Sequence, residues 1–107
     1  MGVVKDGHTV YLDFERIRKV DGFVYFWRLV DNLKPDKHGD LSYTTYYQGD
    51  CKLFRFKVLI GYFYKDQMGR GTGEIFKPKG DDANWLYPSP KSSDEINLKK
   101  VCRYANQ

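Results

Sequence analysis

The stretch "RIRKVDGFVYFWRLVDNL" (16–33) decides the fold class of this chain. Asp21-Gly22 separates two runs that are rich in β-branched and aromatic residues. Both central positions of a two-residue hairpin turn take a positive φ, which glycine accepts readily and aspartate tolerates. The stretch therefore predicts two antiparallel strands joined at Asp21-Gly22.

Strand patterns also stand on both sides of this hairpin. In "HTVYLDF" (8–14), Val10, Leu12 and Phe14 recur with the period of two that marks a half-buried strand. After a charged loop with proline and glycine (34–40), the run "LSYTTYYQ" (41–48) predicts a further strand. We expect this strand to end in a tight turn, "QGD" (48–50).

The run "CKLFRFKVLI" (51–60) predicts a strand that begins at Cys51. Its alternation puts Phe54, Phe56, Val58 and Ile60 on one face. Gly61 indicates a bulge or bend, since glycine inside a strand pattern often marks one. After a glycine-rich loop, "EIFKP" predicts a short edge strand that proline stops.

The C-terminal segment changes to a helical period. Ser92 stands three residues before Glu95, which is the spacing of a capping box at a helix start. An apolar stripe and a polar side follow at helical spacing. The stripe contains Leu98, Val101, Cys102 and Ala105, and the polar side contains Asn97, Lys99, Lys100 and Arg103. The whole pattern predicts an α+β fold, an antiparallel, meander-like sheet of about six strands with a C-terminal α-helix packed on one face.

The chain has two cysteines, Cys51 on a strand and Cys102 on the helical stripe. If the helix packs on the sheet face that carries Cys51, the two sulfurs can form a disulfide, which would indicate an oxidising compartment. The alternative is two unrelated buried thiols. The two cysteines and two histidines are widely separated and lack metal-ligand spacing, so we predict no metal site and no cofactor.

Composition limits the classes that remain. The 107 residues fit one domain, 1–107, and 17% of them are aromatic, which argues against disorder. Eighteen basic and 14 acidic residues give a net charge of +4 without any long block of like charge, so no nucleic-acid-binding tail is indicated. No apolar run reaches the roughly 18 residues that a membrane helix needs.

The glycine loop "QMGRGTGEI" (67–75) suggests a phosphate-binding loop, but its surroundings argue against one. Such loops precede a helix whose amides hold the anion, whereas a β-like run follows here. We expect a flexible hairpin loop with Arg70 at its tip. Neither His8 nor His38 lies beside a nucleophile motif, so we predict that the protein is not an enzyme.

Four blocks resemble, in order and spacing, the surface-adhesin protein E-like family of small exported proteobacterial proteins. They are "KVDGFVYFWRLVDNLKP", "QGDCKLFRFK", "MGRGTGE" and "WLYPSPKSSDEINLKKVC", and they cover nearly the whole chain. The resemblance implies an antiparallel sheet with a C-terminal helix tethered by a disulfide, here Cys51–Cys102. It also implies export, with a leader peptide missing from this chain, to the periplasm, the outer-membrane surface or the exterior.

The resemblance implies a non-catalytic adhesin-like domain that binds a protein partner, such as a host matrix or plasma protein, or an acidic glycan. Alternative hypotheses are a periplasmic structural or accessory protein and a sheet that binds nucleic acid. We expect no nucleic-acid partner in an exported protein, and a homodimer stays an open alternative. The candidate binding residues are basic side chains near the glycine loop and on the helix, namely Lys65, Arg70, Lys99, Lys100 and Arg103.

Overall fold

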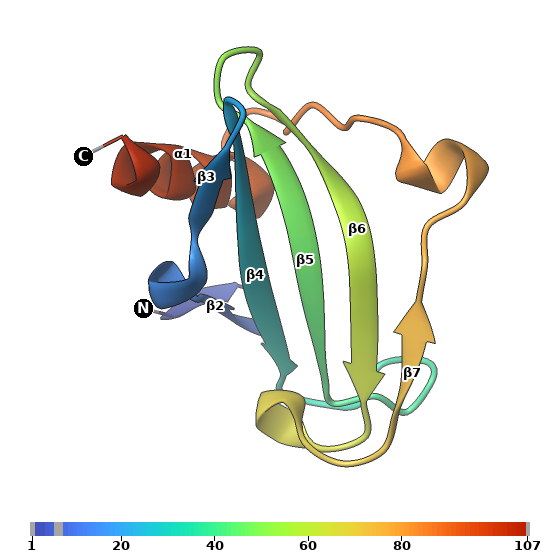
Figure 1. The fold of residues 1–107 in the computed structure, drawn as a ribbon. Coiled ribbons are helices and arrows are strands. Elements are labelled where there is room, and N and C mark those ends of the chain that lie inside the picture. The colour runs from blue at the N-terminus through green and yellow to red at the C-terminus, as the bar shows by residue number, and fades with distance from the viewer. Residues whose placement is uncertain (1, 6–7, 107) are drawn as a thin grey trace.

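The computed structural model describes residues 2–5 and 8–106, in which one antiparallel sheet carries a C-terminal helix on one side (Figure 1). The sheet order is β1-β2-β4-β5-β6-β7, and β3 pairs with β4 beside β2. Because β2 and β3 share one edge of β4, the seven strands occupy six positions, which agrees with the predicted number. The strands are β1 Gly2–Lys5, β2 His8–Leu12, β3 Arg18–Val20, β4 Phe23–Asn32, β5 Ser42–Asp50, β6 Arg55–Tyr64 and β7 Gly73–Phe76. The helices are α1 Ser93–Ala105 and the short 3₁₀ turns η1 Phe14–Arg16, η2 Gln67–Gly69 and η3 Gly80–Ala83.

The hairpin that decides the fold class forms as predicted. Val20 pairs with Phe23 across the turn, and Asp21 and Gly22 both have positive φ, 52° and 84°. The N-terminal part differs from the prediction in two ways. Strand β2 ends at Leu12, so Phe14 lies in η1, and the short β1, which sequence reasoning missed, pairs with β2.

The predicted turn at 48–50 is wrong. These residues continue β5, where Gly49 pairs with Phe56, and the connection to β6 is the turn at 51–54. Gly49 is present because the helix packs closely there: a Cβ at this position would lie 2.9 Å from Val24 Cγ2 and 3.1 Å from Leu98 Cδ1. Cys51 therefore lies in the turn and does not begin β6.

A bulge changes the phase of β6 earlier than Gly61 suggested. Tyr47 pairs with Val58 and Tyr46 pairs with Ile60, so Leu59 is the extra residue. Facing partners share a sheet face, which puts Val58 and Ile60 on opposite faces. The prediction that Ile60 follows Phe56 and Val58 is therefore wrong.

Helix α1 begins as the capping box predicts. The Ser92 hydroxyl accepts a hydrogen bond from the Glu95 amide at 3.1 Å, and the Glu95 carboxylate accepts one from the Lys91 amide at 3.2 Å. The predicted stripe faces the sheet, with Leu98 and Val101 almost fully buried. Asn97, which was expected on the polar side, is also buried.

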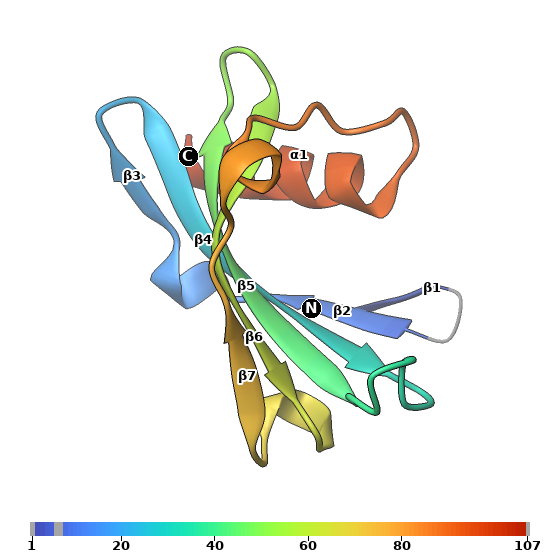
Figure 2. The same ribbon diagram turned by 90° about the vertical axis from the view of Figure 1, so that its right-hand side faces the viewer.

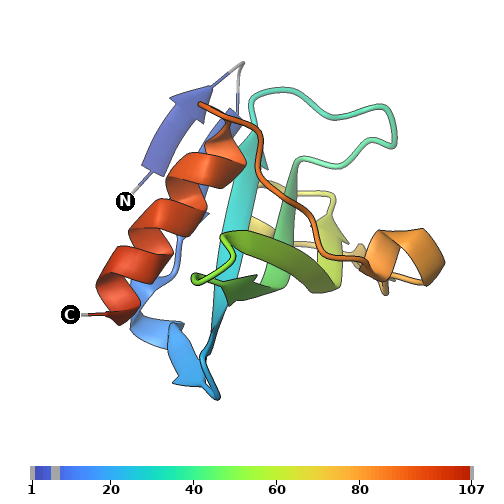
Figure 3. The same ribbon diagram turned by 90° about the horizontal axis from the view of Figure 1, so that it is seen from above.

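The helix packs against one half of one sheet face. The core contains Leu98 and Val101 from α1 and residues from β2, β4, β5 and β6, namely Leu12, Val24, Phe26, Tyr47 and Phe56. Figures 2 and 3 show that β1 and β2 lie on the same side of the sheet as α1. The predicted disulfide Cys51–Cys102 ties the helix to the β5–β6 turn.

Candidate functional site: the helix-free face of the sheet

The opposite face of the sheet carries no α-helix in the described part of the chain. Strand pairing places Trp27, Tyr46 and Ile60 side by side across β4, β5 and β6. Leu29, Thr44 and Tyr62 lie side by side across the same strands, two residues further along β4. The core residues that contact α1 alternate with these residues along each strand, so the two sets point in opposite directions. We call this side the helix-free face; Figure 1 looks onto it.

Aromatic rings form a continuous layer on the helix-free face. The ring centroid of Trp27 lies 4.7 Å from that of Tyr46 and 6.1 Å from that of Tyr62, and Tyr25 lies 6.2 Å from Tyr46. These four rings, which we call the aromatic row, are half-buried by their neighbours. Their outer surfaces therefore stay available to a ligand.

Cations flank the aromatic row. The Arg16 guanidinium lies 5.9 Å from the Trp27 ring centroid, and Arg18 pairs with Tyr25 in the strand register. Arg55 and Lys57 lie 4.2 and 4.8 Å from the ring of Trp85. Aromatic rings attract such cations through the negative charge of their faces. The result is a surface that is both aromatic and basic.

The aspartate beside one of these cations is held ionised. The Asp50 carboxylate accepts hydrogen bonds from the Lys52 and Leu53 amides and from Arg55 Nε at 3.0 Å. Burial alone would raise the pKa of Asp50, but these donors outweigh it and lower the pKa below its ordinary value. Asp50 thus fixes the β5–β6 turn and positions Arg55 beside Trp85.

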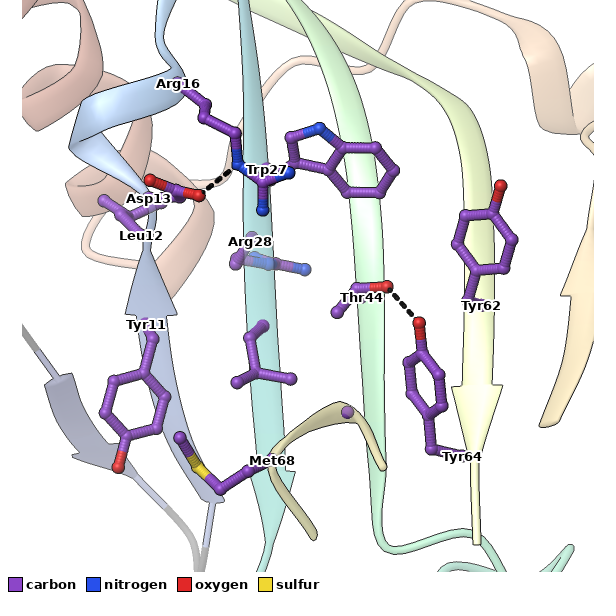
Figure 4. A pocket seen from close by; sticks show the side chains of 12 residues that line it. Tyr11, Leu12, Asp13, Arg16, Trp27, Arg28, Thr44, Tyr62, Tyr64 and Met68 are labelled. Atoms are coloured by element: carbon purple, nitrogen blue, oxygen red, sulfur yellow. Dashed lines mark hydrogen bonds and ion pairs between the residues drawn. The ribbon is translucent and has the colours of Figure 1, made fainter. Parts of the chain in front are cut away.

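A groove of about 530 Å³ opens at the lower part of the helix-free face (Figure 4). Its floor comes from the central strands, and η1 and η2 contribute its two ends. The lining includes Tyr11, Asp13, Arg16, Trp27, Leu29, Thr44, Tyr62, Tyr64, Met68 and Gly69. A volume of this size lies within the usual range of small-ligand sites.

The glycine loop forms one end of the groove and is not a free hairpin tip. The Met68 amide donates to the Asp31 carboxylate at 2.8 Å, and the Gly69 amide donates to the Ser42 hydroxyl at 2.9 Å. These amides are therefore used within the fold. Strand β7, not a helix, follows the loop. The absence of a phosphate-binding role stays a prediction.

The five basic residues singled out from the sequence do not come together. Lys99, Lys100 and Arg103 lie on α1, whereas Lys65 and Arg70 lie beyond the opposite end of the sheet, on the connection between β6 and β7 (Figure 1). The binding role of these five residues stays a prediction, and it concerns two separate surfaces.

Two of these five cations already have acidic partners. Lys65 Nζ pairs with the Asp40 carboxylate at 2.9 Å and donates to the His38 carbonyl at 3.0 Å, and the Asp40 bond raises the pKa of Lys65. Lys99 pairs with Glu95 at 3.4 Å. Among the side chains at positions 9–80 and 83–106, we find no ion pair that involves Arg70, Lys100 or Arg103.

Sequence reasoning missed the aromatic row. A usable signal was present, because "FVYFWRLV" (23–30) has large apolar or aromatic residues at both alternate sets of positions. A single 13-residue helix covers only one face of a sheet. Aromatic residues on both faces of the strands therefore indicate that one aromatic face is left without a helix.

Comparison with known proteins identifies the family. A family model described as surface-adhesin protein E matches residues 1–103. The chain belongs to the surface-adhesin protein E family. Membership of this family indicates an exported, adhesin-like binding protein. None of the described helices is long and apolar enough to cross a membrane.

Solved structures of protein E from Haemophilus influenzae share the fold. Crystal form II has a TM-score of 0.71 at 18% identity, over 98% of this chain and 94% of that chain. A second structure has a TM-score of 0.68 at 19% identity, over 98% and 91%. Protein E from a non-typeable strain has a TM-score of 0.62 at 19% identity, over 97% and 81%. No curated protein sequence matched the chain.

Proposed function

We propose that this protein is a non-catalytic, exported binding domain of the adhesin type, whose partner is a host matrix or plasma protein. The observation that carries the proposal is the aromatic row with its flanking cations on the helix-free face. Trp, Tyr and Arg are the residues that dominate binding energy at protein interfaces. This face presents all three without further rearrangement of the fold.

Two further features support a binding role without catalysis. Both cysteines are joined in the disulfide, so neither is a free nucleophile. His38 lies exposed in the 33–41 loop and is not among the residues that line the groove. Family membership gives the adhesin-like character, and the aromatic row gives a surface on which a partner can bind.

The helix cations have a secondary role in this proposal. Lys99, Lys100 and Arg103 lie on α1, away from the aromatic row, and exposed charges contribute little binding energy singly. They raise the rate of encounter with an acidic partner, an effect that salt screens over about 8 Å at physiological ionic strength. We therefore expect binding to weaken between low and physiological salt.

The test uses immobilised laminin, vitronectin and heparin at two salt concentrations. Trp27→Ala with Tyr62→Ala is expected to weaken protein binding at least about thirtyfold, because hot-spot rings are removed. Charge reversal at Lys99, Lys100 and Arg103 is expected to reduce the association rate and its salt dependence. The matched control Lys37→Glu, in the exposed 33–41 loop, is expected to bind as the unmodified protein does.

Each variant is first checked by its denaturant midpoint, so that loss of binding is not confused with unfolding. If only the helix variant loses binding, the partner binds α1 and the proposal for the helix-free face is wrong. If the unmodified protein binds none of the three at low salt, a periplasmic accessory role replaces the adhesin role.

A further inference from the structure

Aromatic rings line one end of the groove on the helix-free face. Trp27 lies at the same end as Arg16, and the Tyr62 ring centroid lies 6.1 Å from that of Trp27 (Figure 4). The face of an aromatic ring is electron-rich, so it attracts the slightly positive C–H groups on one side of a pyranose ring.

Hydroxyl-bearing side chains also line the groove. Thr44 Oγ1 lies 3.4 Å from the Tyr64 hydroxyl, the Tyr62 hydroxyl points toward the Trp27 end, and the Tyr11 hydroxyl points toward the Met68 end (Figure 4). Each hydroxyl can both donate and accept a hydrogen bond. Such groups match sugar hydroxyls, which also donate and accept.

A guanidinium group stands at one end of the groove. Arg16 Nε is paired with the Asp13 carboxylate, which holds the side chain beside Trp27. In the described part of the chain, Arg16 makes no other ion pair, so its two Nη groups are available to a ligand. The side chain is 69% exposed. A guanidinium with two available N–H groups recognises a carboxylate or a sulfate.

The groove also has a limited length. Arg16 stands at one end and Met68 at the other, where η2 is fixed to the sheet by Asp31 and Ser42 (Figure 4). A groove with two ends favours a ring or a short oligomer over a long nucleic-acid strand, whose binding groove follows the backbone over several nucleotides. The disulfide also indicates an oxidising compartment.

We propose that this groove binds an acidic sugar residue, with the pyranose ring on Trp27 and its carboxylate or sulfate group on the Nη atoms of Arg16. The inference rests on the proposed function in that it treats the chain as a binding domain, and it names a ligand class for one site. Thr44, Tyr62 and Tyr64 bind the sugar hydroxyls. The ligand is recognised by its charge and ring together, so a neutral sugar binds more weakly.

The test is a titration of isotope-labelled full chain, followed by amide and indole N–H signals. The ligands are glucuronate and N-acetylneuraminate for the carboxylate, N-acetylglucosamine 6-sulfate for the sulfate, N-acetylglucosamine as the neutral sugar, and a short oligothymidylate. The expected result is saturable shifts at millimolar acidic sugar for the Trp27 indole and for Asp13 and Gly69. Comparison of the carboxylate and sulfate arms shows which acidic group Arg16 prefers.

Variants separate the contributions of charge and ring. Arg16→Gln is expected to weaken the binding of the acidic sugars about tenfold, because a charge-assisted hydrogen bond is lost. The binding of the neutral sugar is expected to stay unchanged. Tyr62→Phe, which keeps the ring and removes the hydroxyl, is expected to weaken both kinds of sugar by a similar, smaller factor. Lys37→Gln removes one charge from the exposed 33–41 loop, outside the lining of the groove, and is expected to leave the binding of both kinds of sugar unchanged.

Equal binding of acidic and neutral sugars, shifts outside the groove, or no shift at all would overturn the inference. It would also be overturned if only the oligothymidylate bound, because the groove would then be part of a nucleic-acid surface. The matrix-binding experiment is independent of these outcomes. If no sugar binds while laminin or vitronectin still binds, the sugar-binding inference is wrong and the proposed adhesin function stands.

Discussion

The two faces of the sheet carry similar residues and differ in what covers them. On the helix side, Val24, Phe26, Tyr47 and Phe56 are only 1–7% exposed, because α1 packs on them. On the helix-free face, Trp27 and other aromatic rings of the same strands stay half-buried. The position of an aromatic residue along its strand therefore decides whether its ring lies in the core beneath α1 or on the helix-free face.

Removal of the disulfide, which holds α1 on its face of the sheet, is expected to lower the free energy of unfolding most. The bridge spans 51 residues, and the chain-entropy model gives a loss of about 4 kcal/mol for the Cys51→Ser, Cys102→Ser variant. The measurement is the free energy of unfolding from denaturant titration. Mass spectrometry with alkylation, before and after reduction, checks the bridge itself. Two thiols that alkylate freely in non-reduced native protein would contradict the bridge and the argument for export.

Leu98→Ala is expected to remove about 2–5 kcal/mol, because Leu98 is 1% exposed and lies in the core beneath α1. The matched control is Ile96→Ala on the same helix, where the side chain is 42% exposed. This control is expected to change the free energy of unfolding by no more than about 0.5 kcal/mol. Equal effects of the two variants would show that α1 does not cover the face that we assign to it.

A smaller effect is expected from pH, through Asp50. Its pKa is lowered by folding, so its contribution to stability is present above the unfolded pKa of about 3.9 and is lost as the pH falls through the folded pKa. Asp50→Asn should therefore flatten the fall in the free energy of unfolding below about pH 4. If the free energy of unfolding of the variant falls below about pH 4 as steeply as that of the unmodified protein, other carboxylates cause the loss of stability.

Much of the fold was predictable from the sequence, because local signals and tertiary packing agree. Asp21-Gly22 specifies its hairpin through positive φ, and Ser92 with Glu95 specifies the start of α1. The prediction failed where packing at a distance sets the structure. Gly49 looked like a turn residue, yet it is small because Leu98 approaches it.

The candidate site was less predictable than the fold. The bulge at Leu59 reverses the phase of β6, so Ile60 and Tyr62 join the helix-free face only when the pairing with β5 is known. Arg16 comes beside Trp27 because β2 and β3 share one edge of β4, which no local pattern indicates. Exposed cations on α1 were easy to find in the sequence, and they lie away from the aromatic row.

The most direct test of the central claim is hydroxyl-radical footprinting of the free protein and of the protein saturated with laminin or vitronectin, whichever binds it. Tyr104 is the matched reporter on α1, since it is 44% exposed and lies away from the aromatic row. We predict that the partner protects Trp27, Tyr46 and Tyr62 from oxidation and leaves Tyr104 unchanged. Protection of Tyr104 with no change at the aromatic row would contradict the claim that the helix-free face is the binding surface.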